Sequence, residues 1–349
     1  MPTRTLVSLA LLLTLAVPLA ADDAPPAALL DWGKQFLGYC PDESFELEEA
    51  SVPAPAGFTA WTLHQKSSWG PCAQRTTLFG SSDQAIVGRA FPLSADPRPL
   101  EAKIAERARP LLGKDVTVTL EKAKLQDGLK RIRLDYATPE GPLTIGAYLD
   151  KYDENLVIGV LGKLGTDPAR ELLQTLSKGA ATRGKAGSKI VILEVSDLQC
   201  PGCATIHANL EPFVRKHLDE IEYRRVDLPL FEQHDWTLAA AAGGKAIQKI
   251  APAAYWDYID YIFQRQADLT AATIDTAIED FAEGKELDWK KIEREMKSPA
   301  VRRALVAQVG TFFGHGIFGT PTILVNGRII PHAGSGLPIV GYLEEMLKK

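Results

Sequence analysis

Basic charge, long apolar runs and metal-binding residues are all scarce in this sequence. Its 349 residues include 39 Lys and Arg against 44 Asp and Glu, so the net charge of −5 gives no reason to expect nucleic acid as a partner. No apolar run reaches the ~18 residues of a transmembrane helix. The six His and three Met residues show no metal-like spacing, so we predict neither a metal site nor a cofactor.

The composition that remains is ordinary for a globular protein, 46% hydrophobic and 24% charged, over a length that suits two or three domains. At the start of the chain, Arg4 precedes an apolar run from Leu6 to Val17, and small residues end at Ala21. This pattern predicts a signal peptide over residues 1–21 and export to the periplasm or another oxidising compartment. An N-terminal core helix is the alternative, but the polar, Pro-rich residues 22–26 would continue a helix poorly.

Residues 22–178 are predicted to form an α+β domain with a largely antiparallel sheet. Apolar and polar residues alternate, most clearly from Lys130 to Tyr136, as in a sheet with one wet face. Turns rich in Gly and Pro separate the short strands. Helices are predicted over 27–37, 100–112 and 168–176, and strands over 59–65, 73–79, 85–91, 116–122, 130–137, 143–150 and 156–161.

Residues 179–188 carry small and basic residues without an apolar period, which predicts an exposed linker. The second domain, 189–349, then begins with an apolar run typical of a buried strand. Its predicted order is strand 190–195, helix 201–218, strand 221–226, a helical insertion over about 236–314, strands 322–325 and 328–330, and helix 337–347. Asn326-Gly327 is a strong turn signal between the last two strands.

Cys200 and Cys203 stand where the buried strand ends and the helix begins. A helix N-terminus offers unpaired N–H groups and a partial positive charge, and both stabilise a thiolate at Cys200. Because the thiolate is the attacking species in disulfide exchange, we predict that Cys200 is the nucleophile. Cys203 lies one turn further on, where it can resolve the mixed disulfide.

Other uses of this Cys-x-x-Cys pair are less favoured. A zinc site would need a second Cys-x-x-Cys pair. Cys40 and Cys72 do not have this spacing, and they lie in the other domain. A structural bridge would close a ring too short to gain much loop-closure entropy. Metal transfer through the two cysteines is also disfavoured. His207 lies on the same helix, but no His or Met stands near the pair at the spacing of a metal ligand.

Glu194 lies six residues before Cys200, inside an otherwise apolar strand. A buried carboxylate is unfavourable unless it is paired or protonated. We expect burial to raise its pKa, so that it can accept the proton of Cys203 when that thiol attacks. The alternative is a Glu at the strand edge that faces solvent or pairs with a Lys.

Gly319-Thr320-Pro321-Thr322 opens the predicted strand 322–325. Proline at this place removes one ladder hydrogen bond. A cis Pro321 would turn the preceding backbone outward, where it can pair with an extended peptide. A trans proline at an edge strand is the commoner case.

These motifs together resemble the DsbA family of exported thiol-disulfide oxidoreductases, which have a thioredoxin fold. The similar segments are Glu194–Cys203, the insertion segment Trp256–Phe263 and Gly319–Gly327, and the resemblance spans about 189–349. It implies an α/β thioredoxin-like domain with a helical insertion, preceded by the smaller α+β domain.

The resemblance also implies roles for individual residues. Cys200 would attack, Cys203 would resolve, Glu194 would be the buried acid, and Pro321 would be cis beside Cys200. Substrate peptides would lie along Thr320.

Pro201 and Gly202 would belong to the same substrate-binding surface. Gly202 stands where DsbA has a His, so one cationic stabilisation of the thiolate is missing and a weaker oxidant is expected. Thr320 before Pro321 is similar to the exported isomerases DsbC and DsbG, and so is the presence of an extra N-terminal domain.

Cys40 and Cys72 are expected to form a structural disulfide in an exported protein. Closing a loop of this size would stabilise the fold by ~3–4 kcal/mol on the chain-entropy model. The alternative is a second redox pair that exchanges with Cys200 and Cys203.

The leading hypothesis is a thiol-disulfide oxidoreductase that acts on client proteins with cysteines and is recycled by an unidentified redox partner. An isomerase or reductase of the DsbC and DsbG type is the first alternative, and a homodimer would favour it. The second alternative is a non-catalytic chaperone or binding protein on a thioredoxin fold.

Overall fold

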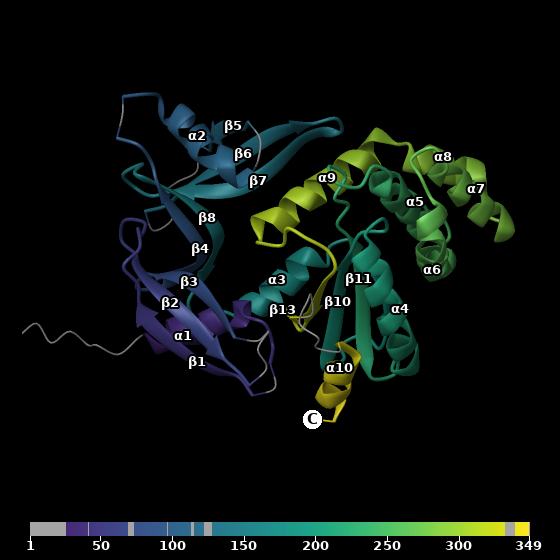
Figure 1. Cartoon of the computed structure of the whole chain (residues 1–349), viewed down its shortest axis with the longest axis horizontal. Helices are drawn as coiled ribbons and strands as arrows, with labels where there is room; N and C mark the ends of the chain where they lie inside the picture. The colour runs from purple at the N-terminus through teal and green to yellow at the C-terminus, as the bar shows by residue number, and fades with distance from the viewer. Residues whose placement is uncertain are drawn as a thin grey trace, which may run out of the picture.

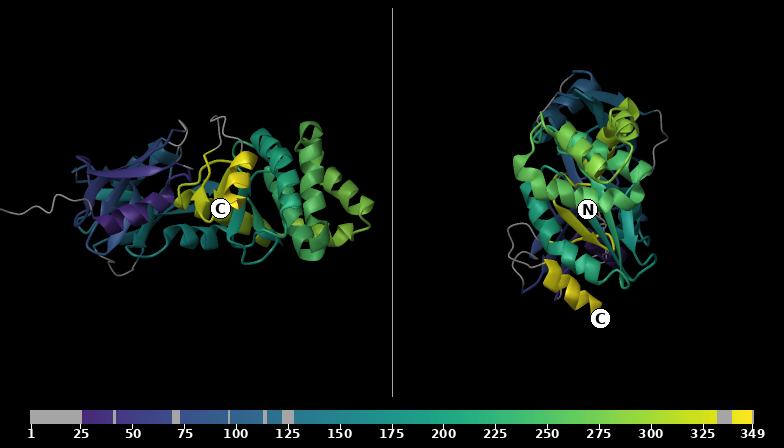
Figure 2. Two further views of the ribbon diagram at one scale, coloured as in Figure 1. Left: turned by 90° about the horizontal axis from the view of Figure 1, so that it is seen from below. Right: turned by 90° about the vertical axis from the view of Figure 1, so that its right-hand side faces the viewer.

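The computed structural model describes residues 26–40, 42–68, 73–95, 97–112, 115–121, 128–331 and 339–348. It contains two sheets, one in each half of the chain (Figure 1). A second view shows an elongated molecule, with the N-terminal sheet at one end and the insertion helices at the other (Figure 2). No helix in the described ranges is both long and apolar enough to cross a membrane. The predicted signal peptide and Cys72 lie outside these ranges.

The N-terminal half is an eight-stranded antiparallel sheet in the order β1-β2-β3-β4-β8-β7-β6-β5. The alternating sequence explains its two faces, since Ile132 and Leu134 of β6 are buried while Arg131 and Arg133 are exposed. The bounds are α1 Ala27–Gly33, η1 Lys34–Phe36, β1 Ser44–Glu49, β2 Thr59–Lys66, β3 Gln74–Gly80, β4 Gln84–Pro92, α2 Leu100–Leu112, β5 Thr117–Leu120, β6 Lys130–Thr138, β7 Gly141–Leu149, β8 Asn155–Lys163 and α3 Pro168–Leu176.

The C-terminal half has a five-stranded sheet in the order β13-β12-β10-β11-β9. β10 and β11 are parallel and the other pairs are antiparallel. Helices α4 and α10 pack on the face that carries Ile190 and Ile192. The bounds are β9 Ala181–Gly184, β10 Ile190–Ser196, α4 Pro201–Lys216, β11 Ile221–Asp227, β12 Thr322–Val325, β13 Arg328–Ile329 and α10 Ile339–Leu347.

The helical insertion joins β11 to β12 and has a core of its own, with Ile247, Tyr258, Ile278 and Phe281 at its centre. Its last helix, α9, runs back towards the N-terminal sheet (Figure 1). The bounds are α5 Thr237–Ile250, η3 Pro252–Ala254, α6 Tyr255–Arg265, η4 Gln266–Asp268, α7 Ile274–Gly284, α8 Trp289–Met296 and α9 Pro299–Gly314.

The predicted linker is wrong in its middle part. Ala181–Gly184 forms β9, which pairs antiparallel with β11 at the edge of the second sheet. The composition did not predict this strand, because an edge strand is held by backbone hydrogen bonds, which need no apolar period. The other unpredicted strand, β1, is also an edge strand, and Leu47 is its one buried residue.

The two halves share one apolar core, so they are not packed independently. Ile145 of β7, Leu172 of α3, Val195 of β10 and Phe312 of α9 all belong to it. Gly310 of α9 permits this close packing, because a Cβ there would lie 2.3 Å from the backbone oxygen of Thr144. The α9 backbone therefore rests directly on the N-terminal sheet.

Arg328 of β13 is the main polar tie between the halves. Its Nη1 and Nη2 atoms lie 2.7 and 2.8 Å from the two carboxylate oxygens of Glu43. It also donates to the backbone oxygens of Gly38 at 2.9 Å and Leu37 at 3.2 Å. A bidentate, largely buried pair of this kind has a fixed geometry.

Tyr39 adds further hydrogen bonds between the two halves. Tyr39 donates its backbone N–H to Ile329 O at 3.1 Å and accepts from the Tyr342 hydroxyl at 2.5 Å. Cys40, which follows, is buried and disulfide-bonded. Its predicted partner, Cys72, is outside the described residues, so that pairing stays a prediction.

Replacing Arg328 by Met should lower the free energy of unfolding by about 3–5 kcal/mol, because it leaves the Glu43 carboxylate without its cation. Urea unfolding followed by circular dichroism measures this change. Arg303→Met is the matched control, since Arg303 is exposed and forms no ion pair with the described residues. Equal losses in the two variants would contradict the role given to Arg328.

Candidate functional site

The site lies at the junction between the end of β10 and the start of α4. Cys200 is the N-cap residue of α4, with extended backbone angles (φ −74°, ψ 119°), and Pro201 is the first helical residue. Proline suits this position because its missing N–H would have no partner there. The N–H groups of Cys203 and Ala204 donate back to Cys200 O at 3.0 and 3.2 Å. The predicted strand–cysteine–helix junction is therefore present.

Cys200 and Cys203 are both free thiols in this structure, but their surroundings differ. Cys200 is partly exposed, whereas Cys203 is fully buried beneath it and accepts a hydrogen bond from Asp197 N at 3.3 Å. The hydrogen bond from the Cys203 thiol is the largest influence on Cys200 and lowers its pKa to about 5, with help from the Cys203 N–H and the Thr320 side chain. Burial raises the pKa of the Cys203 thiol far above its ordinary value.

Thr320 and Pro321 lie beside Cys200, at the start of the neighbouring strand β12. Their peptide bond is cis, and the Thr320 carbonyl oxygen lies 3.6 Å from Cys200 Sγ. Pro321 leads directly into β12, which pairs with β10. Gly202 faces the same point, since a Cβ there would be 3.3 Å from Pro321 Cδ and 3.7 Å from Cys200 Sγ.

The exposed side of this arrangement carries the remaining predicted substrate-binding residues. Pro201 and Gly202 are both exposed at the first turn of α4. With the backbone of Thr320 they surround the accessible sulfur of Cys200. The structure thus brings together all the residues predicted for substrate binding, while their role stays a prediction.

Glu194 is fully buried in β10 but is not an isolated carboxylate. It accepts a hydrogen bond from the Tyr223 hydroxyl, and its Oε1 lies 3.8 Å from Nε of the equally buried Arg225. Arg225 in turn donates to Asp227 Oδ1 at 2.8 Å and to the Tyr255 hydroxyl at 3.0 Å. The expected buried acid is therefore one end of a buried charge network.

Arg225 was not among the predicted site residues, although the sequence carried a signal for it. The strand Ile221–Asp227 is apolar at several positions but also contains charged residues, as β10 does at Glu194. Residues 194 and 225 are neighbours in the parallel register of β10 and β11. That register depends on the fold and cannot be read from either strand alone.

Asp197 is the second functional residue that was missed. This buried carboxylate accepts hydrogen bonds from the backbone N–H groups of Gln199 and Leu230, both at 2.8 Å. It also lies 2.8 Å from His234 Nδ1 and accepts from the Thr237 hydroxyl at 2.5 Å. Asp197 thereby fixes the loop before Cys200 against the start of the helical insertion.

His207, Glu211 and Asp260 form the one group of ligand-type side chains close enough to hold a metal among the described residues. Their ligand atoms already have partners. Asp260 binds His207 Nε2 at 2.7 Å, and Glu211 is paired with Arg183 and Arg215. Two neighbouring guanidinium groups would repel a cation, so this cluster is a charge network between α4, α6 and β9.

The comparisons with known proteins agree with this geometry. Residues 176–337 match the family described as Thioredoxin. Disulfide bond formation protein D of Bacillus subtilis (strain 168) is 24% identical over an alignment of 185 residues that covers 49% of this chain and 78% of that protein. The C-terminal half therefore has the thioredoxin-like fold that the sequence predicted, and residues 1–175 precede the family match.

Solved structures match about half of the chain. Oxidised BdbD of Bacillus subtilis is 20% identical, with a TM-score of 0.44, over 49% of this chain and 95% of that one. The thiol-disulfide exchange protein α-DsbA2 of Wolbachia pipientis is 15% identical, with a TM-score of 0.43, over 52% of this chain and 95% of that one.

The alkylation rate of Cys200 should rise with pH through about 5 and be level at pH 7, because the thiolate is the reactive form. Iodoacetamide labelling of the reduced protein, followed by mass spectrometry, measures this profile. In Cys203→Ala the strongest hydrogen-bond donor to the thiolate is gone, so the inflection should move to higher pH. An inflection near 8.5, the value of a free thiol, in the unsubstituted protein would contradict the geometry.

The same lowered pKa predicts a pH-dependent stability of the reduced protein. The folded state holds the Cys200 thiolate at a pH where the unfolded state still binds a proton, so the stabilisation is complete above the unfolded pKa of ~8.5 and is lost as pH falls through about 5. Thermal unfolding between pH 5 and 8.5 measures it. In Cys200→Ser this part of the pH dependence should disappear.

Arg225→Met should lower the free energy of unfolding by about 3–5 kcal/mol, since it leaves Glu194 and Asp227 buried without their cation. Arg303→Met is again the control, because Arg303 is exposed and forms no ion pair with the described residues, so the expected loss is about 1 kcal/mol or less. Restoring part of the stability by adding Glu194→Gln and Asp227→Asn to Arg225→Met would show that unpaired charge causes the loss. A loss that these substitutions leave unchanged would refute it.

Proposed function

We propose that this chain, whose C-terminal half is thioredoxin-like and related to a disulfide bond formation protein, is an exported thiol-disulfide oxidoreductase with Cys200 as nucleophile. One observation carries the proposal. A partly exposed thiol of low pKa stands at a helix N-terminus, directly above a buried free thiol three residues on. This is the environment of a reactive cysteine rather than of an inert one.

The oxidation of a client would proceed in two exchanges. A client thiolate attacks Cys200 Sγ of the disulfide form, the bond to Cys203 breaks, and Cys203 takes the electron pair and a proton. A second client thiolate then attacks the client sulfur of the mixed disulfide and releases Cys200 as a thiolate. The client gains a disulfide, and the Cys200–Cys203 pair gains two electrons.

The residues around the sulfurs have separate parts in this scheme. The Thr320 carbonyl, beside cis Pro321, offers an acceptor for the backbone of a bound client near Cys200. Glu194 lies on the face of β10 that α4 covers, with its Oε1 lacking a hydrogen-bond partner among the described residues. In our proposal this carboxylate exchanges the proton of Cys203, whose raised pKa requires a base.

The low pKa of Cys200 favours the oxidising direction. A stabilised thiolate stabilises the reduced form, and a pair whose reduced form is stable is a strong oxidant. The isomerase or reductase alternative needs the same nucleophile but a more reducing pair. Equilibration with glutathione separates the two, because strong oxidants lie near −120 mV and isomerases near −180 mV or below.

The proposed setting is an oxidising compartment outside the cytoplasm. Its support is the charged and apolar pattern of residues 1–21 and the disulfide at Cys40. The proposed partners are client proteins with cysteines and a redox protein that reoxidises the Cys200–Cys203 pair. Labelling of Cys40 in protein taken from the native cell envelope, with and without prior reduction, tests the oxidising setting.

Cys200→Ser should reduce the rate of disulfide formation in a reduced client at least about 100-fold, because the attacked sulfur is gone. Oxidation of reduced ribonuclease, followed by the recovery of its activity, measures this rate. Cys203→Ser cannot form the Cys200–Cys203 disulfide and should also fail to oxidise the reduced client. With a client that already holds a disulfide, its Cys200 thiolate should attack one client sulfur, release the other as a thiolate and leave a mixed disulfide that persists, since the resolving thiol is missing. Full activity in Cys200→Ser would exclude the proposed chemistry and favour a non-catalytic binding protein.

A further inference from the structure

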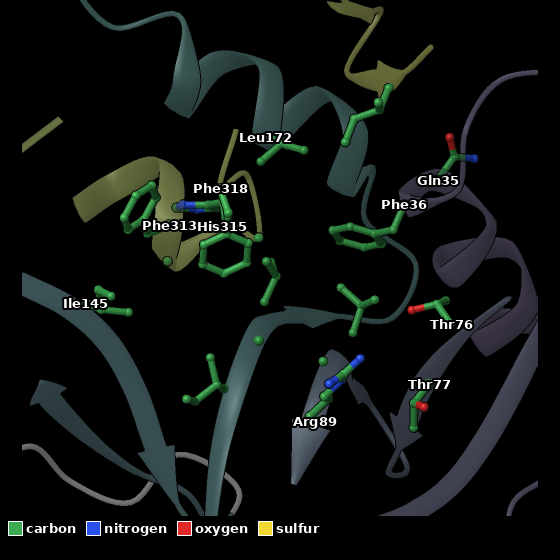
Figure 3. Close-up of a pocket in the computed structure, with 18 of the residues that line it drawn as sticks. Gln35, Phe36, Thr76, Thr77, Arg89, Ile145, Leu172, Phe313, His315 and Phe318 are labelled. Atoms are coloured by element: carbon green, nitrogen blue, oxygen red, sulfur yellow. The ribbon is translucent and has the colours of Figure 1, made fainter. Parts of the chain in front are cut away.

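A cavity of about 830 Å³ lies between the N-terminal sheet and the loop that joins α9 to β12 (Figure 3). The N-terminal half supplies Phe36, Ile145 and Leu172 to its wall, the end of α9 supplies Phe313, and the α9–β12 loop supplies Phe318. Its volume is in the range of ligand-binding sites, and its walls are mainly apolar. No role described so far uses this cavity.

Bare backbone forms part of the cavity wall. Gly88 of β4 and Gly159 of β8 stand opposite each other in the sheet. A Cβ on Gly88 would lie 2.3 Å from Ile158 O, and a Cβ on Gly159 would lie 2.3 Å from Val87 O, so neither position accepts a side chain. The two glycines therefore let the backbones of β4 and β8 approach closely, and they line the cavity without side chains.

Strand β4 has an edge without a strand partner beside the cavity. β3 and β4 are paired over three positions, from Leu78–Gly80 to Ala85–Val87. Beyond Val87, β4 continues past Gly88 and Arg89 with β8 as its neighbour. Unpaired strand edges are places where an extended polypeptide can add its own backbone hydrogen bonds.

Arg89 gives the cavity a charge preference. It extends into the cavity from β4 (Figure 3), is exposed, and forms no ion pair or hydrogen bond with the described residues. Among the described residues, no Asp or Glu lines the cavity, although the chain as a whole carries a net charge of −5. A free guanidinium beside apolar walls is complementary to a ligand that has apolar groups and a carboxylate.

One loop connects the wall of the cavity to the redox site. Phe318 lines the cavity with 56% of its surface exposed, and Thr320 follows two residues later. Two residues span at most ~7 Å, and Thr320 O is 3.6 Å from Cys200 Sγ. A chain bound to Cys200 can therefore reach the cavity within a few residues.

We infer that this cavity receives an extended client segment next to the reacting cysteine, with apolar side chains inside and an acidic side chain on Arg89. The inference rests on the proposed function and adds the class of client sequence that the protein selects. It assigns the N-terminal half a part in substrate choice, since that half supplies Arg89 and most of the apolar wall.

Three synthetic peptides test this, each with one cysteine held as a mixed disulfide with thionitrobenzoate. The first has Val, Ile and Leu around the cysteine and one Asp, the second has Ser and Gly in place of the apolar residues, and the third has Lys in place of Asp. The Cys200 thiolate of the reduced protein attacks the peptide sulfur and releases thionitrobenzoate, whose absorbance gives the rate. Cys203 then releases the peptide thiol, and the Cys200–Cys203 disulfide forms.

The unsubstituted protein should react with the first peptide about tenfold faster than with the second, because burial of one or two apolar side chains favours that complex by this factor. In Arg89→Glu the preference should shift from the Asp peptide to the Lys peptide, by about fivefold. In Phe318→Ala the advantage of the apolar peptide over the polar one should fall by about threefold or more. Arg303→Glu and Tyr152→Ala are the matched controls, since both residues are exposed and lie outside the cavity lining, and should keep the unsubstituted preferences.

The glutathione–thionitrobenzoate mixed disulfide separates this inference from the proposed function. If the protein releases thionitrobenzoate from glutathione but treats the three peptides alike, the chemistry holds and the inference is wrong. If Arg89→Glu prefers the Asp peptide over the Lys peptide as strongly as Arg303→Glu does, the inference is also wrong. Failure to react with glutathione and all three peptides would instead overturn the proposed function itself.

Discussion

The pairing of β12 with β10 is the interaction on which the rest of the site depends. It places Pro321 and Thr320 against Cys200, which is 120 residues earlier in the chain. The whole helical insertion lies between these two segments in the chain and packs against the site, since Cys203 belongs to its apolar core. Asp197 anchors the start of that insertion to the loop before Cys200, and Gln266 of the insertion donates to Cys200 O at 3.1 Å.

Two kinds of environment meet at the cysteine pair. Cys200 lies in a place where hydrogen bonds and a helix N-terminus favour negative charge, while Cys203 lies in a place where burial opposes it. The difference supports the proposed roles of Cys200 as the nucleophile and of Cys203 as the resolving thiol. Below them, Glu194, Arg225 and Asp227 form a charged network in the sheet, which is stable only while its members remain paired.

The two halves of the chain are packed together, because the two sheets share an apolar core and α9 rests on β7. Arg328 and the segment before Cys40 fix their relation further. This rigid relation is what gives the cavity its second wall. A flexible tether between the halves would have left only a flat sheet and a loop.

Local pattern alone determined much of this protein. The Cys200–Cys203 junction, helices α2 and α3 and the turn at Asn326-Gly327 follow from spacing, capping and turn chemistry over a few residues, and the structure confirms these elements. The edge strands β1 and β9, the partner of Glu194, the contacts of Asp197 and the cavity at Arg89 were decided by tertiary structure. Each depends on strand register or on packing between residues far apart in the chain, and a local sequence pattern carries neither.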